Sequence, residues 1–232
     1  MKNMILALVL IAPLSSYAQG PASKVLNKLV VDLDGDGKPD VVTVYDTGNA
    51  EFLVLEVRLS KEQKTLRYER LVRRTHAQRA DRNDNDGSMC RDVNENEFTV
   101  GTAGSFLWKE VTGEYDGCLQ ESRKEITFQY ANGDLLVQRE KASSKEWHAG
   151  DPAPFGSTDI DFGSKRIVVT AGEMHIVRAG ETANASLPMD CQAPALKAYI
   201  EAGLPSCASK VEDQLLGKVN AIVDKKLTGS EQ

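Results

Sequence analysis

The sequence predicts a mainly β protein, folded from antiparallel hairpins into a sandwich or a curved sheet, with a helical segment at its C-terminal end. Short β-branched and aromatic runs bounded by glycine, asparagine and aspartate fill most of the chain, which is typical of strands joined by turns. Helical spacing of apolar residues begins only after Cys191. No repeat of roughly 20–50 residues recurs, so the sequence argues against a full propeller.

The first predicted strands flank an acidic loop. β-branched residues fill 29–31 and 41–45 on either side of it. In the next segment, 52–59, one face would carry apolar residues and the other mostly polar ones. The first set is Leu53, Leu55, Val57 and Leu59, and the second is Val54, Glu56 and Arg58. This period of two predicts a strand with one face buried and the other in solvent.

The clearest hairpin signal lies in the middle of the chain. Two alternating segments, 126–130 and 135–138, flank Asn132 and Gly133. Both residue types tolerate the positive φ angles that a two-residue hairpin turn requires. The segment therefore predicts two antiparallel neighbours in a sheet.

Two further predictions cover the region before the helices. A second hairpin is expected over 166–178, with its turn at 171–173, where Gly172 separates two apolar runs. Residues 151–163 are rich in proline, glycine, serine and aspartate. Such clusters are typical of loops, so no strand is predicted there.

The C-terminal region changes to a helical pattern. Residues 195–202 predict a short helix that ends at Gly203, before Pro205. A longer amphipathic helix is predicted next, with Ser209 as its cap and Glu212 as the partner of that cap. Its apolar stripe, at steps of three and four residues, consists of Val211, Leu215, Val219, Ile222, Val223 and Leu227.

The first 18 residues have the pattern of a secretory signal peptide. Lys2 gives a positive start, an apolar run covers 4–14, and the small residues Ser16 and Ala18 precede a cut ahead of Gln19. An apolar run of about eleven residues is too short for a transmembrane helix, which needs about 20. We therefore expect a periplasmic or secreted mature chain without a membrane span.

The mature chain is predicted to contain a β-rich domain over 19–190 and a helical tail over 191–232 packed on it. Its four cysteines are Cys90, Cys118, Cys191 and Cys207. An even number in an oxidising compartment predicts two disulfides. Three pairings are open; the pairing of sequence neighbours is favoured, and it would link the helical tail to its own base. Zinc is disfavoured because no close Cys-x-x-Cys pair is present.

Charge excludes one class of partner. The formal net charge is −6, and loss of Lys2 with the leader makes it −7. Nucleic-acid binding needs clustered lysine and arginine, which this acidic chain lacks. The one basic stretch, 67–82, is interrupted by Glu69 and Asp81 and predicts a solvated face.

The most specific chemistry lies in residues 32–40, which we call the acidic loop. Carboxylates occupy its first, third, fifth and ninth positions: Asp32, Asp34, Asp36 and Asp40. Lys38 at the seventh position would add its backbone carbonyl, and Gly37 at the sixth permits a sharp turn. This pattern predicts a calcium site, since magnesium retains its waters and seldom uses an all-protein cage. The alternative is an acidic turn that binds nothing, because aspartate and glycine are common turn residues.

The sequence around the loop distinguishes it from an EF-hand. Position twelve is Thr43 rather than glutamate, and Pro39 opposes a helix there. The segment 30–44 resembles the calcium loop of FG-GAP or VCBS-type repeats, found in integrin α-chain propellers and many exported bacterial proteins. The resemblance covers about fifteen residues and has no second copy. It implies the four aspartates as ligands, not a complete propeller.

No other cluster forms a recognisable active site. Residues 81–87 repeat part of the acidic pattern, but the glycine falls one position late, so a turn without a metal is expected. His76, His148 and His175 are not at coordinating spacing. No nucleophile elbow, phosphate loop or dinucleotide fingerprint is present.

The leading hypothesis is a calcium-stabilised, non-enzymatic binding protein of the bacterial envelope, whose partner is an envelope protein or a glycan. An inhibitor or immunity-type protein is one version of it. A calcium-dependent envelope hydrolase acting on glycan or peptidoglycan is an alternative, and a pocket with carboxylates of raised pKa would favour it. A structural module of the envelope is a third hypothesis. The sequence does not predict the oligomeric state.

Overall fold

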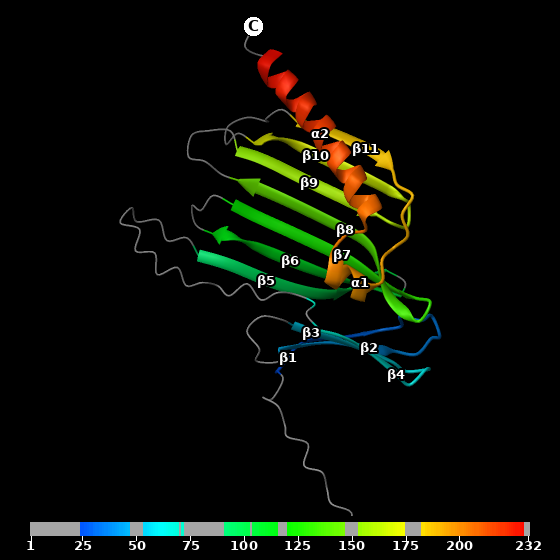
Figure 1. Ribbon diagram of the computed structural model, residues 1–232. Coiled ribbons are helices and arrows are strands. Elements are labelled where there is room, and N and C mark those ends of the chain that lie inside the picture. Colours follow the sequence, from blue (N-terminus) through cyan, green and yellow to red (C-terminus); the bar gives the residue numbers. More distant parts are fainter. Residues whose placement is uncertain are drawn as a thin grey trace, which may run out of the picture.

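The computed structural model describes residues 24–46, 53–69, 71, 91–102, 104–115, 120–146, 153–174 and 182–229. The strands among them form two antiparallel sheets, and two helices follow the last strand (Figure 1). The predicted fold class, mainly β with a C-terminal helical segment, is therefore confirmed. Within these ranges the strands form open sheets and not the blades of a propeller. The predicted leader, 1–18, lies outside the described residues.

The smaller sheet contains four strands in chain order: β1 (Lys24–Val31), β2 (Asp40–Asp46), β3 (Leu53–Leu59) and β4 (Lys64–Tyr68). Strands flank the acidic loop as predicted, and β1 pairs with β2 with Val31 opposite Asp40. β3 differs from the half-exposed strand expected, because Val54 and Glu56 are buried along with its leucines. Glu56 is tolerated there because the Arg58 Nε lies 2.7 Å from its carboxylate.

The larger sheet contains seven strands, each antiparallel to its neighbour in chain order: β5 (Arg91–Val100), β6 (Ser105–Tyr115), β7 (Gln120–Ala131), β8 (Asp134–Glu146), β9 (Ala153–Asp161), β10 (Arg166–Met174) and β11 (Thr182–Pro188). The sheet is twisted, and the smaller sheet lies beyond its β5 edge (Figure 1).

The hairpin predicted around Asn132 and Gly133 joins β7 to β8. The two residues have φ angles of 55° and 83°, as this turn requires. Two other predictions were wrong. Most of the stretch expected to be a loop forms β9, and β10 runs straight through Gly172, where a turn was expected.

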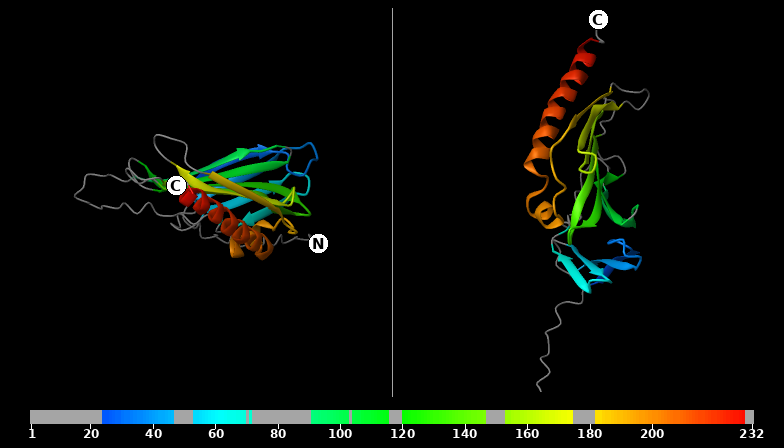
Figure 2. Two further views of the ribbon diagram at one scale, coloured as in Figure 1. Left: turned by 90° about the horizontal axis from the view of Figure 1, so that it is seen from above. Right: turned by 90° about the vertical axis from the view of Figure 1, so that its right-hand side faces the viewer.

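Both helices lie on one face of the larger sheet (Figure 2). The first, α1 (Leu196–Ala202), packs against β8 and buries Leu196. It ends as predicted at Gly203, which has a φ of 74° and donates its backbone N–H to the Tyr199 carbonyl oxygen at 2.8 Å. No described helix has the length and apolar character to cross a membrane.

The second helix, α2 (Ser206–Gly229), packs on β10 and β11. It begins three residues before the predicted cap, Ser209, because the Pro205 carbonyl already accepts the Ser209 backbone N–H at 3.1 Å. Leu215, Val219 and Val223 of the predicted stripe are buried, whereas Ile222 is 42% exposed. The buried stripe is therefore narrower than the predicted one.

The predicted Cys191–Cys207 disulfide is present, with its Cα atoms 6.1 Å apart. It joins the chain ahead of α1 to the start of α2. Cys90 and Cys118 lie outside the described residues.

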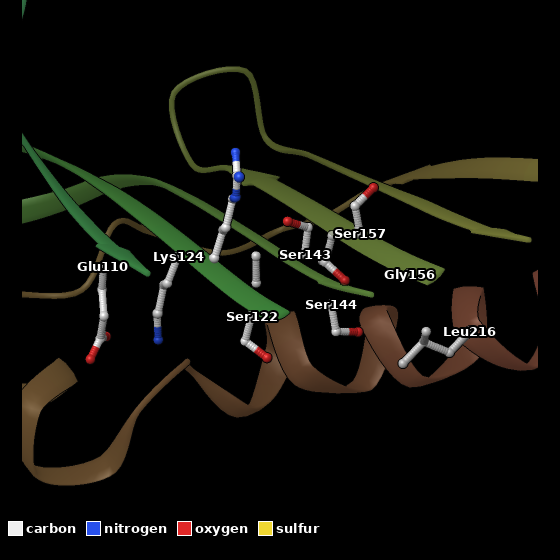
Figure 3. A pocket seen from close by; sticks show the side chains of 11 residues that line it. Glu110, Ser122, Lys124, Ser143, Ser144, Gly156, Ser157 and Leu216 are labelled. Carbon is white, nitrogen blue, oxygen red and sulfur yellow. The ribbon is translucent and has the colours of Figure 1, made fainter. Parts of the chain in front are cut away.

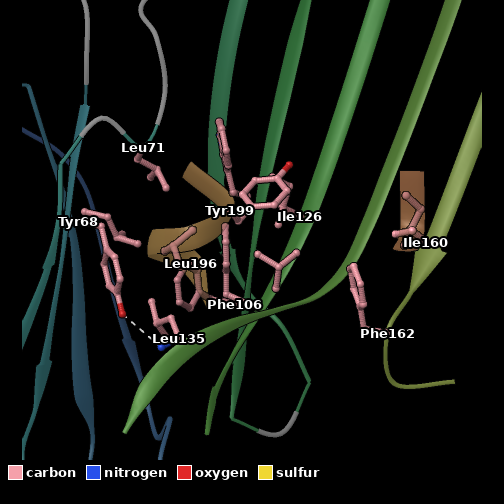
Figure 4. Packing of buried hydrophobic residues seen from close by; sticks show 14 of the residues in the cluster. Tyr68, Leu71, Phe106, Ile126, Leu135, Ile160, Phe162, Leu196 and Tyr199 are labelled. Carbon is pink, nitrogen blue, oxygen red and sulfur yellow. Dashed lines mark hydrogen bonds between the residues drawn. The ribbon is translucent and has the colours of Figure 1, made fainter. Parts of the chain in front are cut away.

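One hydrophobic core joins both sheets and both helices (Figure 4). Phe106 and Phe128 lie at its centre, with ring centroids 4.9 Å apart. Hydrogen bonds also link the two sheets: Tyr68 of β4 accepts the Leu135 backbone N–H of β8 at 3.2 Å and donates its hydroxyl to Asp134. The smaller sheet therefore closes one end of the larger sheet and is continuous with its core.

Candidate functional site

The acidic loop is held in shape by hydrogen bonds from its backbone to its own carboxylates. The Asp32 carboxylate accepts the backbone N–H groups of residues 35–37 at 2.9–3.1 Å. Asp34 accepts the Asp36 N–H at 3.1 Å, and Asp36 accepts the Lys38 N–H at 2.7 Å. The two glycines of the loop have φ angles of 75° and 82°, which other residues rarely adopt.

The end of the loop is fixed by Asp40, which is only 1% exposed. One of its carboxylate oxygens accepts the Leu33 N–H at 2.9 Å, and the other accepts the Ser60 N–H at 2.8 Å. Asp40 thus joins the start of the loop to the residue that follows β3.

The start of the loop is docked on the larger sheet. The Leu33 side chain belongs to the core, with 3% of its surface exposed. Gly104, in the turn between β5 and β6, lies so close that a Cβ there would be 3.1 Å from the Leu33 carbonyl oxygen. The loop therefore contacts two other segments of the chain, at Ser60 and at Gly104.

Three of the four predicted side-chain ligands converge. Asp32, Asp34 and Asp40 each offer a carboxylate oxygen, and these oxygens lie within 4.8 Å of one another. Asp36 is not in this group; one of its carboxylate oxygens accepts the Lys38 backbone N–H, and the Lys38 side chain is exposed. Loss of solvent raises the pKa of Asp34, and the charges of Asp36 and Asp40 raise it further. The donor set of hard oxygens fits a metal ion, and this cluster could hold one.

Several candidate residues lie outside the described part of the chain. These are Cys90, Cys118, the acidic stretch 81–87, and the three histidines, His76, His148 and His175.

A second candidate site, which the sequence did not predict, is a pocket of about 370 Å³ between the larger sheet and α2 (Figure 3). β6, β7, β8 and β9 line it from the sheet side, and Leu216 lines it from α2. Its floor is made of small residues, including Ser122, Ser144, Gly156 and Thr158. These short side chains leave space between the sheet and the helix.

Figure 3 shows which side chains face this space. Glu110, Ser122, Lys124 and Ser144 turn toward the helical side, whereas Ser143 and Ser157 turn to the opposite face. This follows from the alternation of side chains along a strand.

A hydrogen-bonded charge network stands at the edge of the pocket. The Lys124 Nζ lies 3.0 Å from one Glu140 carboxylate oxygen, and the Tyr199 hydroxyl donates to the other at 2.6 Å. The Lys124 Nζ also lies 5.2 Å from the centre of the Tyr199 ring. Burial, followed by the charge of Glu140, raises the pKa of Tyr199, so the phenol stays a donor. Glu140, only 6% exposed, is therefore fully paired.

Glu110 contrasts with Glu140. Glu110 lies opposite Lys124 in the β6–β7 register. Within the described residues, however, its carboxylate makes no hydrogen bond or ion pair, and the Lys124 ammonium group pairs with Glu140 instead. Burial raises the pKa of Glu110, and Lys124 opposes that shift. Glu212 of α2 also has a raised pKa because of burial, although a hydrogen bond with Thr158 counteracts it. Among the described residues, the pocket region thus holds three carboxylates, Glu110, Glu140 and Glu212, for the one ammonium group of Lys124.

Comparison with known proteins adds no assignment: no family model, no curated protein and no solved structure matches the chain. The resemblance of segment 30–44 to FG-GAP-type calcium loops therefore stays a prediction, based on the aspartates of the loop.

Proposed function

We propose that the protein is an exported, non-enzymatic binding protein of the bacterial envelope, stabilised by one calcium ion in the acidic loop. One observation carries this proposal: the metal cluster and the pocket belong to different parts of the fold. The cluster lies between β1 and β2, whereas β6–β9 and α2 line the pocket. An ion in the loop would rigidify the fold, and the pocket would be free to bind a ligand.

The surroundings of the acidic loop support a stabilising role for calcium. Calcium accepts six to eight oxygen ligands in irregular geometry, which suits a carboxylate cluster. The loop already contacts Ser60, which follows β3 of the smaller sheet, and Gly104, which lies in the turn between β5 and β6 of the larger sheet. An ion bound to the folded loop stabilises that fold by mass action.

Two observations support export of the protein from the cytoplasm. The Cys191–Cys207 disulfide is typical of an oxidising compartment. The apolar start of the chain, 4–14, has the length of a signal peptide. The partner would be an envelope protein or a glycan, and an inhibitor or immunity-type role is one version of this function.

Calorimetric titration of calcium into the mature, oxidised protein tests the proposal. We expect one saturable site, which Asp34→Asn removes and Asp36→Asn retains, because only Asp34 belongs to the converging cluster. Absence of heat together with an unchanged melting temperature would contradict the calcium assignment. Equal losses in the two variants would show that the ligand set is wrong.

The hydrolase alternative is favoured by one observation, the pocket in which Glu110 has a raised pKa. A buried carboxyl group whose pKa is raised above its ordinary value is a candidate general acid. Incubation with purified peptidoglycan separates the two functions. A hydrolase would release soluble fragments and lose this activity in Glu110→Gln, whereas a binding protein would release none.

A further inference from the structure

We propose that the pocket between α2 and strands β6–β9 binds a small primary ammonium compound that also carries hydroxyl groups. Glu110 would be the counter-ion of the ammonium group, and Ser122 and Ser144 would hydrogen-bond to the hydroxyl groups. This inference rests on the proposed binding function and names the class of ligand.

The charge balance of the pocket selects a cation. Glu110, Glu140 and Glu212 all lie within electrostatic reach of Lys124, which is the one cation facing them from the described residues. Lys124 is engaged by Glu140, so it does not compensate Glu110 fully. Arg123 also lines the pocket, but strand alternation directs its side chain to the other face, where it pairs with Glu121. A ligand ammonium group would supply the missing positive charge.

The other walls select for hydroxyl groups. Ser122 and Ser144 are opposite each other in the β7–β8 register and both face the helix (Figure 3). Hydroxyl side chains donate and accept hydrogen bonds, so they match ligand hydroxyls in either direction. Leu216 of α2 provides an apolar wall against which a carbon skeleton can pack. The volume of about 370 Å³ is within the range of small-molecule pockets.

The site is also preorganised. The Lys124 ammonium group is held between Glu140 and the Tyr199 ring, and Glu140 is held by the Tyr199 hydroxyl. The floor belongs to the centre of the seven-stranded sheet, where each strand is paired on both sides. A ligand would therefore meet fixed groups, which lowers the entropic penalty of binding.

The experiment is a titration of the isotopically labelled mature protein with glucosamine, followed by backbone amide NMR at a pH where its amino group is protonated. We expect saturable shifts at residues 122–124, 142–144 and 156–158. N-acetylglucosamine has the same ring but no charge, and it should bind at least tenfold more weakly. Nα-acetyl-lysine amide, an ammonium without hydroxyl groups, should also bind more weakly than glucosamine.

Two variants locate the counter-ion. Glu110→Gln should weaken glucosamine binding at least tenfold, whereas Glu125→Gln should leave it unchanged. Glu125 is on the same strand as Lys124, but strand alternation places it on the opposite face. No saturable shift with glucosamine, or equal binding by Glu110→Gln, would overturn the proposal. Stronger binding of the lysine derivative would overturn its hydroxyl part and indicate a protein side chain as ligand. None of these outcomes affects the calcium titration, so the two proposals fail separately.

Discussion

The acidic loop and the pocket beneath α2 both gather carboxylates, but they satisfy them in opposite ways. In the loop, both oxygens of buried Asp40 accept backbone N–H groups, and Asp32 accepts three more. In the pocket, Glu110 faces open space and has a raised pKa. The carboxylates of the loop stabilise the fold through hydrogen bonds, whereas the carboxylate of Glu110 is available to a ligand. Burial alone therefore does not separate a structural carboxylate from a binding one; the hydrogen-bond partners do.

The largest expected effect is that of Asp40→Ala. Two N–H groups would lose a buried charged acceptor, each such bond contributing about 1.5–3 kcal/mol, so we expect a loss of about 3–6 kcal/mol in the free energy of unfolding. Urea unfolding in the presence of chelator measures it without a contribution from metal. Asp36→Ala, which affects one exposed contact, should lose less than about 1 kcal/mol. Similar losses in both variants would show that Asp40 has no special role.

Calcium should give the next largest effect. Ligand present at about 100 times its dissociation constant stabilises a folded protein by about 2.7 kcal/mol. We expect chelator to remove this gain from the unmodified protein and to leave Asp34→Asn unaffected. Thermal unfolding with and without calcium measures it. A calcium-dependent gain that persists in Asp34→Asn would place the ion elsewhere.

Tyr199→Phe tests the network that holds Lys124. Its hydroxyl is one of two partners of buried Glu140, so the variant should lose about 1–3 kcal/mol in the free energy of unfolding. Tyr130→Phe is the matched control, because the Tyr130 hydroxyl contacts exposed Glu62 at 3.3 Å. Its loss should be under about 0.5 kcal/mol. Urea unfolding at neutral pH compares them, and equal losses would break the distinction between the two tyrosines.

The smallest effect is a pH dependence carried by Glu110. Its pKa is raised in the folded protein above the ordinary value of 4.5, because burial disfavours its charged form. The stability from this group is present in full below the ordinary pKa and is lost as pH rises through the folded pKa. Glu110→Gln cannot ionise, so it should melt above the unmodified protein at pH 7 but not at pH 4. The measurement is the difference in melting temperature between Glu110→Gln and the unmodified protein, taken at pH 7 and again at pH 4. The same difference at both pH values would contradict the prediction.

The sequence predicted the parts of the molecule whose signals are local. The acidic loop needs nine consecutive residues, the β7–β8 turn needs Asn132 and Gly133, and the end of α1 needs Gly203. Each of these features is fixed by backbone conformations that few residue types adopt. The spacing of the aspartates along the chain does not show which carboxylates converge: in the structure those of Asp32, Asp34 and Asp40 do, whereas Asp36 accepts the Lys38 backbone N–H.

The pocket and the strand that contributes to its floor were missed for one physical reason. β9 contains Gly156, Ser157 and Thr158, and such small polar residues are typical of loops. In the structure these residues belong to a central strand. α2 passes over them, and the pocket lies between the strand and the helix. Residues from four strands and a helix compose this site, so no spacing along the chain reveals it.

The contacts that close the smaller sheet also set the order in which the chain can fold. Asn27 donates its side-chain amide to the Phe98 carbonyl, 71 residues later, and Tyr68 accepts the N–H of Leu135, 67 residues later. Contacts between distant residues form slowly, because the intervening chain must first be confined. During synthesis, which starts at the N-terminus, β1–β4 are therefore made long before the strands that they pack against. The first sheet made is among the last to be completed, and a chain that stops before the β7–β8 turn leaves Tyr68 without its partners Asp134 and Leu135.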